Sequence, residues 1–220
     1  IREGNARFRV NLSDYLDTGI FLDHRPARLM THESVSGKSV LNLFCYTGAF
    51  SIHAALGGAK NVMSVDLSRT YLSWAVDNMR LNGFTGKVSL GDEKNPPDTG
   101  APFIFFRQDA VAFLKKAVRS GDKWDYIICD PPTFSNSKKL DDVFDINRQW
   151  SELCRLCLAV LSPGGTLLFS TNSRKLAFDA NLIGGAASNG STAITDISDW
   201  SIPEDFRNKK IHRMWKFVRS

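Results

Sequence analysis

Residues 39–56 read SVLNLFCYTGAFSIHAAL, and this stretch decides the fold class. The apolar run Ser39–Phe44 has the length and composition of a buried strand, and Gly48–Leu56 has helical periodicity. Four further pairs of the same kind follow: residues 61–65 with 68–81, 103–106 with 110–118, 126–129 with 141–161, and 165–170 with a weaker helix from Lys175. Five strand–helix units in succession predict an α/β protein with a doubly wound, mostly parallel sheet.

The two ends of the chain depart from this repeat. Residues 191–197 and 211–218 are β-like runs, and we expect them to pair as an antiparallel edge at the C-terminal end of the sheet. Residues 8–12 and 18–21 predict a short N-terminal hairpin before a helix over 24–30. Residues 91–102, rich in Gly, Pro and Asp, predict a surface insertion. The sequence therefore divides into a hairpin appendage, residues 1–24, and one α/β domain, residues 25–220.

Composition excludes several classes of protein. The 220 residues are 43% hydrophobic, which is enough to build a core and argues against a disordered chain. No apolar run approaches the roughly 20 residues that a membrane crossing needs, so we expect no membrane partner. The formal net charge of +5 permits a nucleic-acid partner without establishing one.

The four cysteines indicate a reducing compartment. Cys154 and Cys157 have CxxC spacing, but no second pair and no histidine cluster accompanies them. We therefore expect no metal, reduced thiols and a cytoplasmic location. The chain begins with Ile1 rather than Met, which suggests that something upstream is missing.

Polar residues follow the predicted strands where an open α/β sheet binds its ligands. The turn after the first strand retains only Gly48 of a GxGxxG pattern, with Tyr46 and Ser51 at the other two positions, so a dinucleotide is an improbable ligand. Asp66 suits the hydroxyls of a ribose and Asp109 suits an adenine amino group, although each is also a good helix N-cap. A nucleoside without phosphates, such as S-adenosylmethionine, fits this pair of carboxylates.

The sequence Asp130-Pro-Pro-Thr-Phe134 is the most specific signal in the chain. Two prolines directly after a buried strand stiffen the turn and remove two N–H donors. An aromatic residue after such a turn can form a slot for a flat base, with Phe134 as the stacking platform. The alternative is a strand-terminating turn followed by a core phenylalanine.

These residues resemble a known family. Residues 11–25, 41–51, 65–72, 130–138 and 203–208, together with Ile211, His212 and Trp215, are similar to class I S-adenosylmethionine-dependent RNA methyltransferases. Within that family they resemble the 23S rRNA large-subunit group, in particular the C-terminal half of a fused enzyme that methylates guanine N7. The resemblance implies a Rossmann-like fold, S-adenosylmethionine as cofactor and ribosomal RNA as partner. It also implies that residues 1–24 are the edge of an upstream RNA-binding segment.

The resemblance assigns roles to individual residues. Phe21, Asp23 and Arg25 would lie over the methionine end of the cofactor, with Arg25 opposite its carboxylate. Residues 46–51 would wrap the methionine, Asp66 the ribose, and Asp109 with Ala110 the adenine. The full expected cofactor set is Phe21, Asp23, Arg25, Asn42, Phe44, Tyr46, Thr47, Gly48, Ala49, Ser51, Asp66, Leu67, Ser68, Asp109, Ala110 and Asp130. The base slot and catalytic set is Asp130, Pro131, Pro132 and Phe134.

Guanine N7 methylation is the expected reaction, and other reactions stay open. Methylation of an exocyclic amine, guanine N2 or adenine N6, uses similar turns after the fourth strand. Cytosine-C5 methylation needs a thiolate, and residues 169–174 contain none. A non-catalytic RNA-binding module and a nicotinamide-dependent oxidoreductase are the alternatives from other classes.

Basic residues follow the fourth and fifth predicted strands. As a group they suggest phosphate contacts, although any one of them could be a solvated loop residue. The expected RNA contacts are Lys138, Lys139, Arg174 and Lys175, with residues 207–210 as an equally weighted extension or charged turn.

Overall fold

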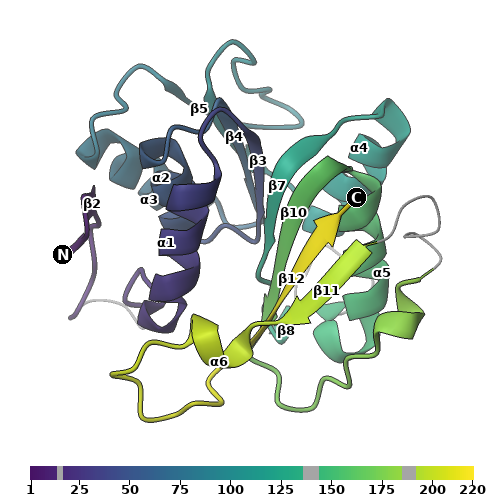
Figure 1. The fold of residues 1–220 in the computed structure, drawn as a ribbon. Coiled ribbons are helices and arrows are strands. Elements are labelled where there is room, and N and C mark those ends of the chain that lie inside the picture. The colour runs from purple at the N-terminus through teal and green to yellow at the C-terminus, as the bar shows by residue number, and fades with distance from the viewer. Residues whose placement is uncertain (14–16, 136–143, 185–191) are drawn as a thin grey trace.

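The computed structural model describes residues 1–13, 17–135, 144–184 and 192–220. Eight strands form one sheet in the order β11-β12-β10-β7-β3-β4-β6-β5 (Figure 1). β3, β4, β5, β6, β7 and β10 are parallel, whereas β12 is antiparallel to both β10 and β11. Their bounds are β3 Ser39–Leu43, β4 Asn61–Asp66, β5 Val88–Asp92, β6 Phe103–Arg107, β7 Trp124–Cys129, β10 Leu161–Thr171, β11 Thr192–Asp196 and β12 Arg213–Arg219. The predicted doubly wound sheet with an antiparallel C-terminal edge is confirmed.

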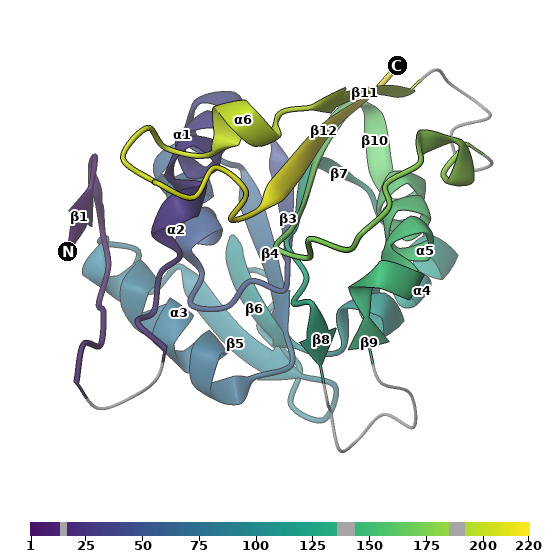
Figure 2. The same cartoon turned by 90° about the horizontal axis from the view of Figure 1, so that it is seen from below.

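Helices cover both faces of this sheet (Figures 1 and 2). Helices α1, α2 and α3 contribute to one core cluster, and α4 and α5 contribute to the other. Adjacent strand residues alternate between the two clusters, as Val40 and Leu41 do, which is why the central strands are apolar throughout. The bounds are α1 Arg25–Ser34, α2 Ala49–Leu56, α3 Arg69–Leu81, α4 Ala110–Ser120, α5 Ile146–Ala159 and the short α6 Ser198–Ser201.

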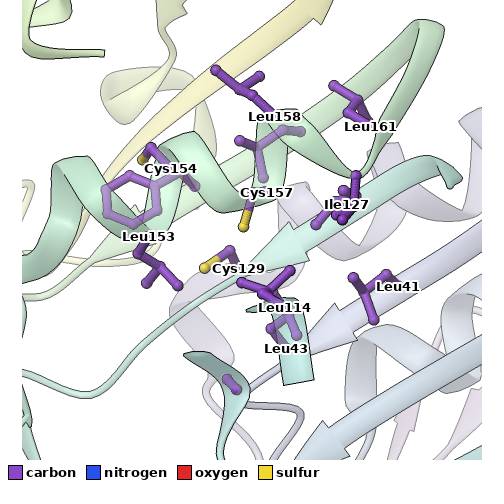
Figure 3. Packing of buried hydrophobic residues seen from close by; sticks show 14 of the residues in the cluster. Leu41, Leu43, Leu114, Ile127, Cys129, Leu153, Cys154, Cys157, Leu158 and Leu161 are labelled. Atoms are coloured by element: carbon purple, nitrogen blue, oxygen red, sulfur yellow. The ribbon is translucent and has the colours of Figure 1, made fainter. Parts of the chain in front are cut away.

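Three of the four cysteines lie in the core between α5 and β7. Figure 3 shows the sulfur atoms of Cys129 and Cys157 pointing toward one another, with Cys154 nearby on the same helix. Burial raises the pKa of the Cys129 and Cys154 thiols well above the usual range. All four cysteines are free, and the CxxC spacing reflects one buried helix face.

Three predicted elements differ from those observed. The expected insertion at residues 91–102 begins inside β5, an edge strand that the sequence concealed because none of its five residues is fully buried. The helix expected from Lys175 is absent from residues 175–184, where Ala180–Leu182 forms only a 3-10 turn. The N-terminal hairpin pairs β1 (Arg2–Glu3) with β2 (Ala6–Arg7), earlier than expected, and one hydrogen bond, Asn11 N to the Thr18 carbonyl (3.0 Å), links the segments predicted to pair.

The N-terminal segment packs onto the domain. Ala6, Phe8 and Ile20 are buried in the same core cluster as α1, α2 and α3. Glu3 accepts two hydrogen bonds from the fully buried Arg28 of α1, at 2.7 and 2.6 Å, and its Oε1 lies 2.9 Å from His53 Nε2 on α2. The domain boundary at residue 24 stays a prediction. Among the described residues, no helix combines the length and apolar character that a membrane crossing requires.

The ion pair of Glu3 generates a prediction about stability. Burial raises the pKa of Glu3, but the hydrogen bonds and charges of Arg28 and His53 outweigh it and lower that pKa to about 2. Glu3→Gln should therefore reduce the free energy of unfolding at pH 7 by about 1 to 3 kcal/mol, because Arg28 loses its counter-charge. Denaturant unfolding of both proteins measures this difference.

The pH dependence and a matched variant check the cause. A carboxylate with a lowered pKa stabilises the fold above its unfolded value of 4.5, and this advantage disappears as the pH falls toward about 2. Glu33 is exposed and lies on α1, the helix of Arg28. Glu33→Gln should leave the free energy of unfolding unchanged. Equal losses from the two variants would contradict the role given to the Glu3–Arg28 pair.

Candidate functional site

The loop after β3 has an unusual backbone. Phe44, Tyr46 and Gly48 have φ values of 56°, 51° and 77°, a region that residues with side chains rarely adopt. Surrounding contacts hold this loop: Tyr46 Oη accepts a hydrogen bond from Gly19 N (3.1 Å), and the Thr47 carbonyl accepts one from Asn78 Nδ2 (3.0 Å). A Cβ at Gly48 would lie 2.9 Å from the Cβ of Ala75, so only glycine fits against α3.

The loops after β3 and β4 are joined through Asp66. Its Oδ2 accepts a hydrogen bond from Tyr46 N (2.9 Å), and its Oδ1 accepts one from Ser68 N (2.8 Å). Burial raises the pKa of Asp66 even though these backbone N–H groups lower it. Asp66 is thus a desolvated carboxylate at the carboxyl end of β4, in the place expected for a ribose-binding group.

A cavity of about 650 Å³ lies over the carboxyl ends of β3, β4, β6 and β7. This is the edge beside the reversal of strand order between β3 and β7, where open α/β sheets bind ligands. Fourteen of the expected residues line it: Phe21, Asn42, Phe44, Tyr46, Ala49, Asp66, Leu67, Ser68, Asp109, Ala110, Asp130, Pro131, Pro132 and Phe134. The volume is in the range of about 300 to 1,000 Å³ that small-molecule pockets occupy.

Asp109 marks the adenine end expected of this cavity. It is the N-cap of α4, where its Oδ1 accepts a hydrogen bond from Ala112 N at 2.8 Å. The helix-capping interpretation of Asp109 therefore holds, and the residue lines the cavity as well. Its role toward an adenine stays a prediction.

The turn Asp130-Pro-Pro-Thr-Phe134 forms the other end of the cavity. The Ser170 hydroxyl of β10 donates a hydrogen bond to Asp130 Oδ1, and Thr133 Oγ1 donates one to Asn172 Oδ1 at 2.6 Å. Phe134 is 59% exposed, so it is a surface aromatic and not a core residue. The carboxylate, the prolines and an open aromatic ring thus line one space.

A buried chain of polar side chains lies behind Asp130. Ser201 Oγ is 2.8 Å from His212 Nε2, and His212 Nδ1 is 2.7 Å from Asp23 Oδ2. His24 stacks on His212 with ring centroids 4.2 Å apart, and its Nε2 lies 3.6 Å from Asp130 Oδ2. Burial lowers the pKa of His24, which is therefore neutral at pH 7. Both nitrogens of His212 are occupied by these partners, so Ser201, His212 and Asp23 form a hydrogen-bonded chain, and His24 stacks against it.

Five expected cofactor residues do not line the cavity. Thr47, Ser51 and Gly48 support its walls: Thr47 Oγ1 donates to the Gly19 carbonyl, and Ser51 Oγ accepts a hydrogen bond from Asn42 Nδ2 at 2.9 Å. Asp23 is held by His212. Arg25 pairs with Asp205 at 2.7 Å and lines a second cavity of about 570 Å³, so the structure does not bring it to the methionine end.

Other residues line the cavity without having been named individually in the expected cofactor and base-slot sets. Gln108, Thr133 and Asn172 could have been found by the rule that selected Asp66, because each follows the end of a strand. Cys45 and Phe50 lie in the segment after β3 that supplied Phe44 and Tyr46, and the others depend on packing between distant segments. The unassigned lining residues are Asp17, His24, Arg28, Cys45, Phe50, Tyr71, Gln108, Thr133, Phe144 and Asn172. Of the expected RNA contacts, Arg174 and Lys175 are exposed after β10, and Lys138 and Lys139 lie outside the described residues.

A family comparison identifies the domain. Residues 1–206 match the model of the S-adenosylmethionine-dependent methyltransferase family. This chain belongs to that family. The methyltransferase is 47% identical over 99% of its length to the ribosomal RNA large subunit methyltransferase K/L of Pseudomonas syringae pv. syringae, and 47% identical over its whole length to the protein of that name from Hahella chejuensis. It spans only 26% and 28% of these relatives.

Solved structures support the same assignment. A methyltransferase crystallised with SAH has a TM-score of 0.71 and 28% identity, and the match covers 96% of this chain and 53% of that one. The predicted Rossmann-like fold and the predicted S-adenosylmethionine-dependent methyltransferase are confirmed. The residues of the cavity fit S-adenosylmethionine, because carboxylates lie at the ends of β4 and β6 and apolar side chains lie between them.

Asp66 gives the first test of the site. Asp66→Ala should weaken S-adenosylmethionine binding roughly 10- to 100-fold, since hydrogen bonds to a charged acceptor contribute about 1.5 to 3 kcal/mol. Affinity for the cofactor should also decline as the pH falls through the raised pKa of Asp66, because only the carboxylate accepts both ribose hydroxyls. Titration calorimetry measures both effects.

Asp92 provides the matched control. It also ends a strand, β5, and accepts backbone hydrogen bonds from residues 94 and 95, but it does not line the cavity. Asp92→Ala should leave cofactor affinity within twofold of the original protein. Unchanged binding in Asp66→Ala would show that the ribose is held elsewhere.

Proposed function

We propose that this domain transfers a methyl group from S-adenosylmethionine to N7 of a guanine in large-subunit ribosomal RNA. The observation that carries the proposal is the continuity of the cavity, which has Asp66 and Asp109 at one end and the Asp130–Phe134 turn at the other. The large-subunit rRNA methyltransferases that resemble this chain support the choice of substrate. A reaction on ribosomal RNA is consistent with a cytoplasmic location.

The side chains at the turn suit attack by a ring nitrogen. S-adenosylmethionine supplies a methyl group on a positively charged sulfur. Guanine N7 carries an in-plane lone pair, so the residues of the turn have to position the base and need not remove a proton. Phe134 offers a stacking surface, and the rigid Pro131–Pro132 backbone limits the space beside it.

In this proposal Asp130 stabilises a positive charge on the base. Its carboxylate is held by the Ser170 hydroxyl, and its other oxygen faces the neutral His24 at 3.6 Å. A fixed carboxylate at this point stabilises the positive charge that develops on a purine methylated at N7. The same carboxylate could accept a proton from an exocyclic amine, so guanine N2 and adenine N6 are tested as alternative outcomes.

Cytosine-C5 methylation is disfavoured by the position of the thiols. Cys45 is the one cysteine that lines the cavity within the described part of the chain, and it follows β3 at the cofactor end. Burial and the charge of Asp66 raise the pKa of Cys45 well above its usual range. A protonated thiol away from the base slot is a poor nucleophile for a pyrimidine ring.

The reaction product tests the proposal. The full chain is incubated with labelled S-adenosylmethionine and unmodified 23S rRNA, and the digested RNA is analysed by nucleoside mass spectrometry. We expect 7-methylguanosine, and its loss in Asp130→Ala. Formation of N2-methylguanosine, N6-methyladenosine or 5-methylcytidine would replace the proposed atom. Cofactor binding without any methylated nucleoside would contradict the substrate assignment for this chain.

Substitutions of two exposed aromatic residues, one at each end of the cavity, distinguish the cofactor end from the base end. Phe134→Ala should lower kcat/KM for the RNA about tenfold or more with unchanged cofactor affinity, because stacking of a base contributes about 1 to 3 kcal/mol. Phe134→Tyr keeps a stacking surface and should retain most activity. Phe21→Ala, at the cofactor end and against Tyr46, should instead weaken S-adenosylmethionine binding. Identical behaviour of Phe21→Ala and Phe134→Ala would contradict the division into cofactor and base ends.

A further inference from the structure

A third cavity, of about 650 Å³, adjoins the methyl-transfer cavity. Asn172, at the carboxyl end of β10, lines both of them. Its Oδ1 accepts the hydrogen bond from Thr133 of the base turn, so a residue shared by the two spaces is held by that turn. We call this third cavity the β10–α6 groove; its walls come from residues 171–174, 196–200, 209, 210, 212 and 213.

The groove carries an exposed aromatic ring. Trp200, on α6, is 54% exposed, although tryptophan is a residue that folded chains generally cover. The register of β10 with β12 pairs Thr171 with Arg213, which places the segment leading from α6 into β12 at the carboxyl edge of the sheet. In Figure 1, α6 lies at the lower edge, where the parallel strands end.

The charge of the groove is positive. Arg174, Lys209, Lys210 and Arg213 line it, against two acidic residues, Asp196 and Asp199. Arg213 is committed to Asp196 at 3.8 Å and to the Trp215 ring. Within the described residues, Arg174 and Lys210 have no carboxylate at ion-pair distance, and both are exposed. Exposed cations that line the same groove as an exposed indole are the combination that binds single-stranded nucleic acid through phosphates and stacked bases.

Helix α6, which carries Trp200, is connected to residues beside Asp130 in the methyl-transfer cavity. Ser201, the next residue, is fully buried and bonds to His212, which bonds to Asp23. His24 stacks on His212 and its Nε2 lies 3.6 Å from Asp130 Oδ2. Four buried polar side chains thus connect the groove to the turn that receives the base. This support fixes the position of α6 relative to Asp130 before any ligand arrives.

We propose that the β10–α6 groove holds the single-stranded RNA segment next to the methylated nucleotide. Trp200 stacks on a flanking base, and Arg174 and Lys210 contact phosphates, while the target base lies beside Phe134. This inference rests on the proposed function, because it gives the RNA substrate its path across the surface. Of the two basic residues expected to contact RNA after β10, Arg174 lines this groove and Lys175 does not, and Lys210 comes from the charged segment 207–210.

The first test replaces the platform. Trp200→Ala should raise the KM for 23S rRNA about tenfold and leave the Kd for S-adenosylmethionine unchanged. Trp200→Phe keeps an aromatic ring, so its KM for 23S rRNA should stay close to that of the original protein. Leu182→Ala is the matched control, because Leu182 is also 54% exposed but lines neither cavity. An unchanged KM in Trp200→Ala would overturn the proposal.

The second test removes the charges. The double variant Arg174→Ala/Lys210→Ala should reduce the slope of log K against log salt for a single-stranded RNA oligonucleotide by about 1.4, since each phosphate contact contributes about 0.7. The control, Lys60→Ala/Lys87→Ala, removes the same charge at the opposite edge, before β4 and β5, and should leave the slope unchanged. Equal slopes for the two double variants would overturn the proposed phosphate contacts in the groove.

Comparison of the wild-type protein with the groove variants distinguishes failure of the groove proposal from failure of the proposed function. Methylation of rRNA by the wild type together with full activity of the groove variants would overturn the groove and retain the proposed function. Absence of both RNA binding and methylation by the wild type would overturn both. Loss of RNA affinity in the groove variants, with cofactor affinity intact, would support both.

Discussion

The Asp66 carboxylate is the interaction on which the rest of the site depends. It accepts backbone hydrogen bonds from Tyr46 and Ser68 and so ties the loops after two adjacent parallel strands to one point. Tyr46 has a backbone conformation that costs free energy in an isolated chain, and such conformations persist only where neighbouring contacts compensate. The hydrogen bonds to Asp66 and from Gly19 supply that compensation. The cavity is consequently shaped by the fold itself.

The two ends of the cavity are held by different means. The end with Asp66 is fixed by backbone groups, which leaves little freedom for change without unfolding the loop. The end with Asp130 is fixed by side-chain hydrogen bonds to Ser170 and Asn172 of the β10 segment. Substitutions on β10 could therefore reshape the base slot while the opposite end stays intact. This difference is consistent with one cofactor being used by enzymes with many substrates.

The sequence predicted those parts of the fold that depend on local pattern. The parallel strands were predictable because each central strand is buried on both faces and reads as an apolar run. Strand β5 was concealed because an edge strand with partly exposed residues lacks that run. Asp66, Asp109 and Asp130 were located by a topological rule that needs no coordinates: they follow strands that end at the same edge.

Residues brought in by long-range packing were beyond the sequence. Arg25 and Arg28 are three positions apart on α1, and nothing in their local sequence distinguishes them. Arg28 lines the cavity because Glu3 and the Phe21 carbonyl hold it there, whereas Arg25 pairs with Asp205, 180 positions further along the chain. Likewise, His24 is held beside Asp130 by its stacking on His212, a residue 188 positions further along the chain. Such partners are chosen by tertiary structure, which a single sequence does not specify locally.

The buried thiols of Cys129, Cys154 and Cys157 are native probes of local opening in this protein. Because they lie between α5 and β7 without access to solvent, an alkylating reagent reaches them only when that layer separates. The labelling rate would therefore report how often the helix lifts from the sheet, without any introduced probe. If a ligand binds only the closed state, labelling becomes slower. The ratio of the two labelling rates then gives the free energy by which the ligand stabilises the closed state.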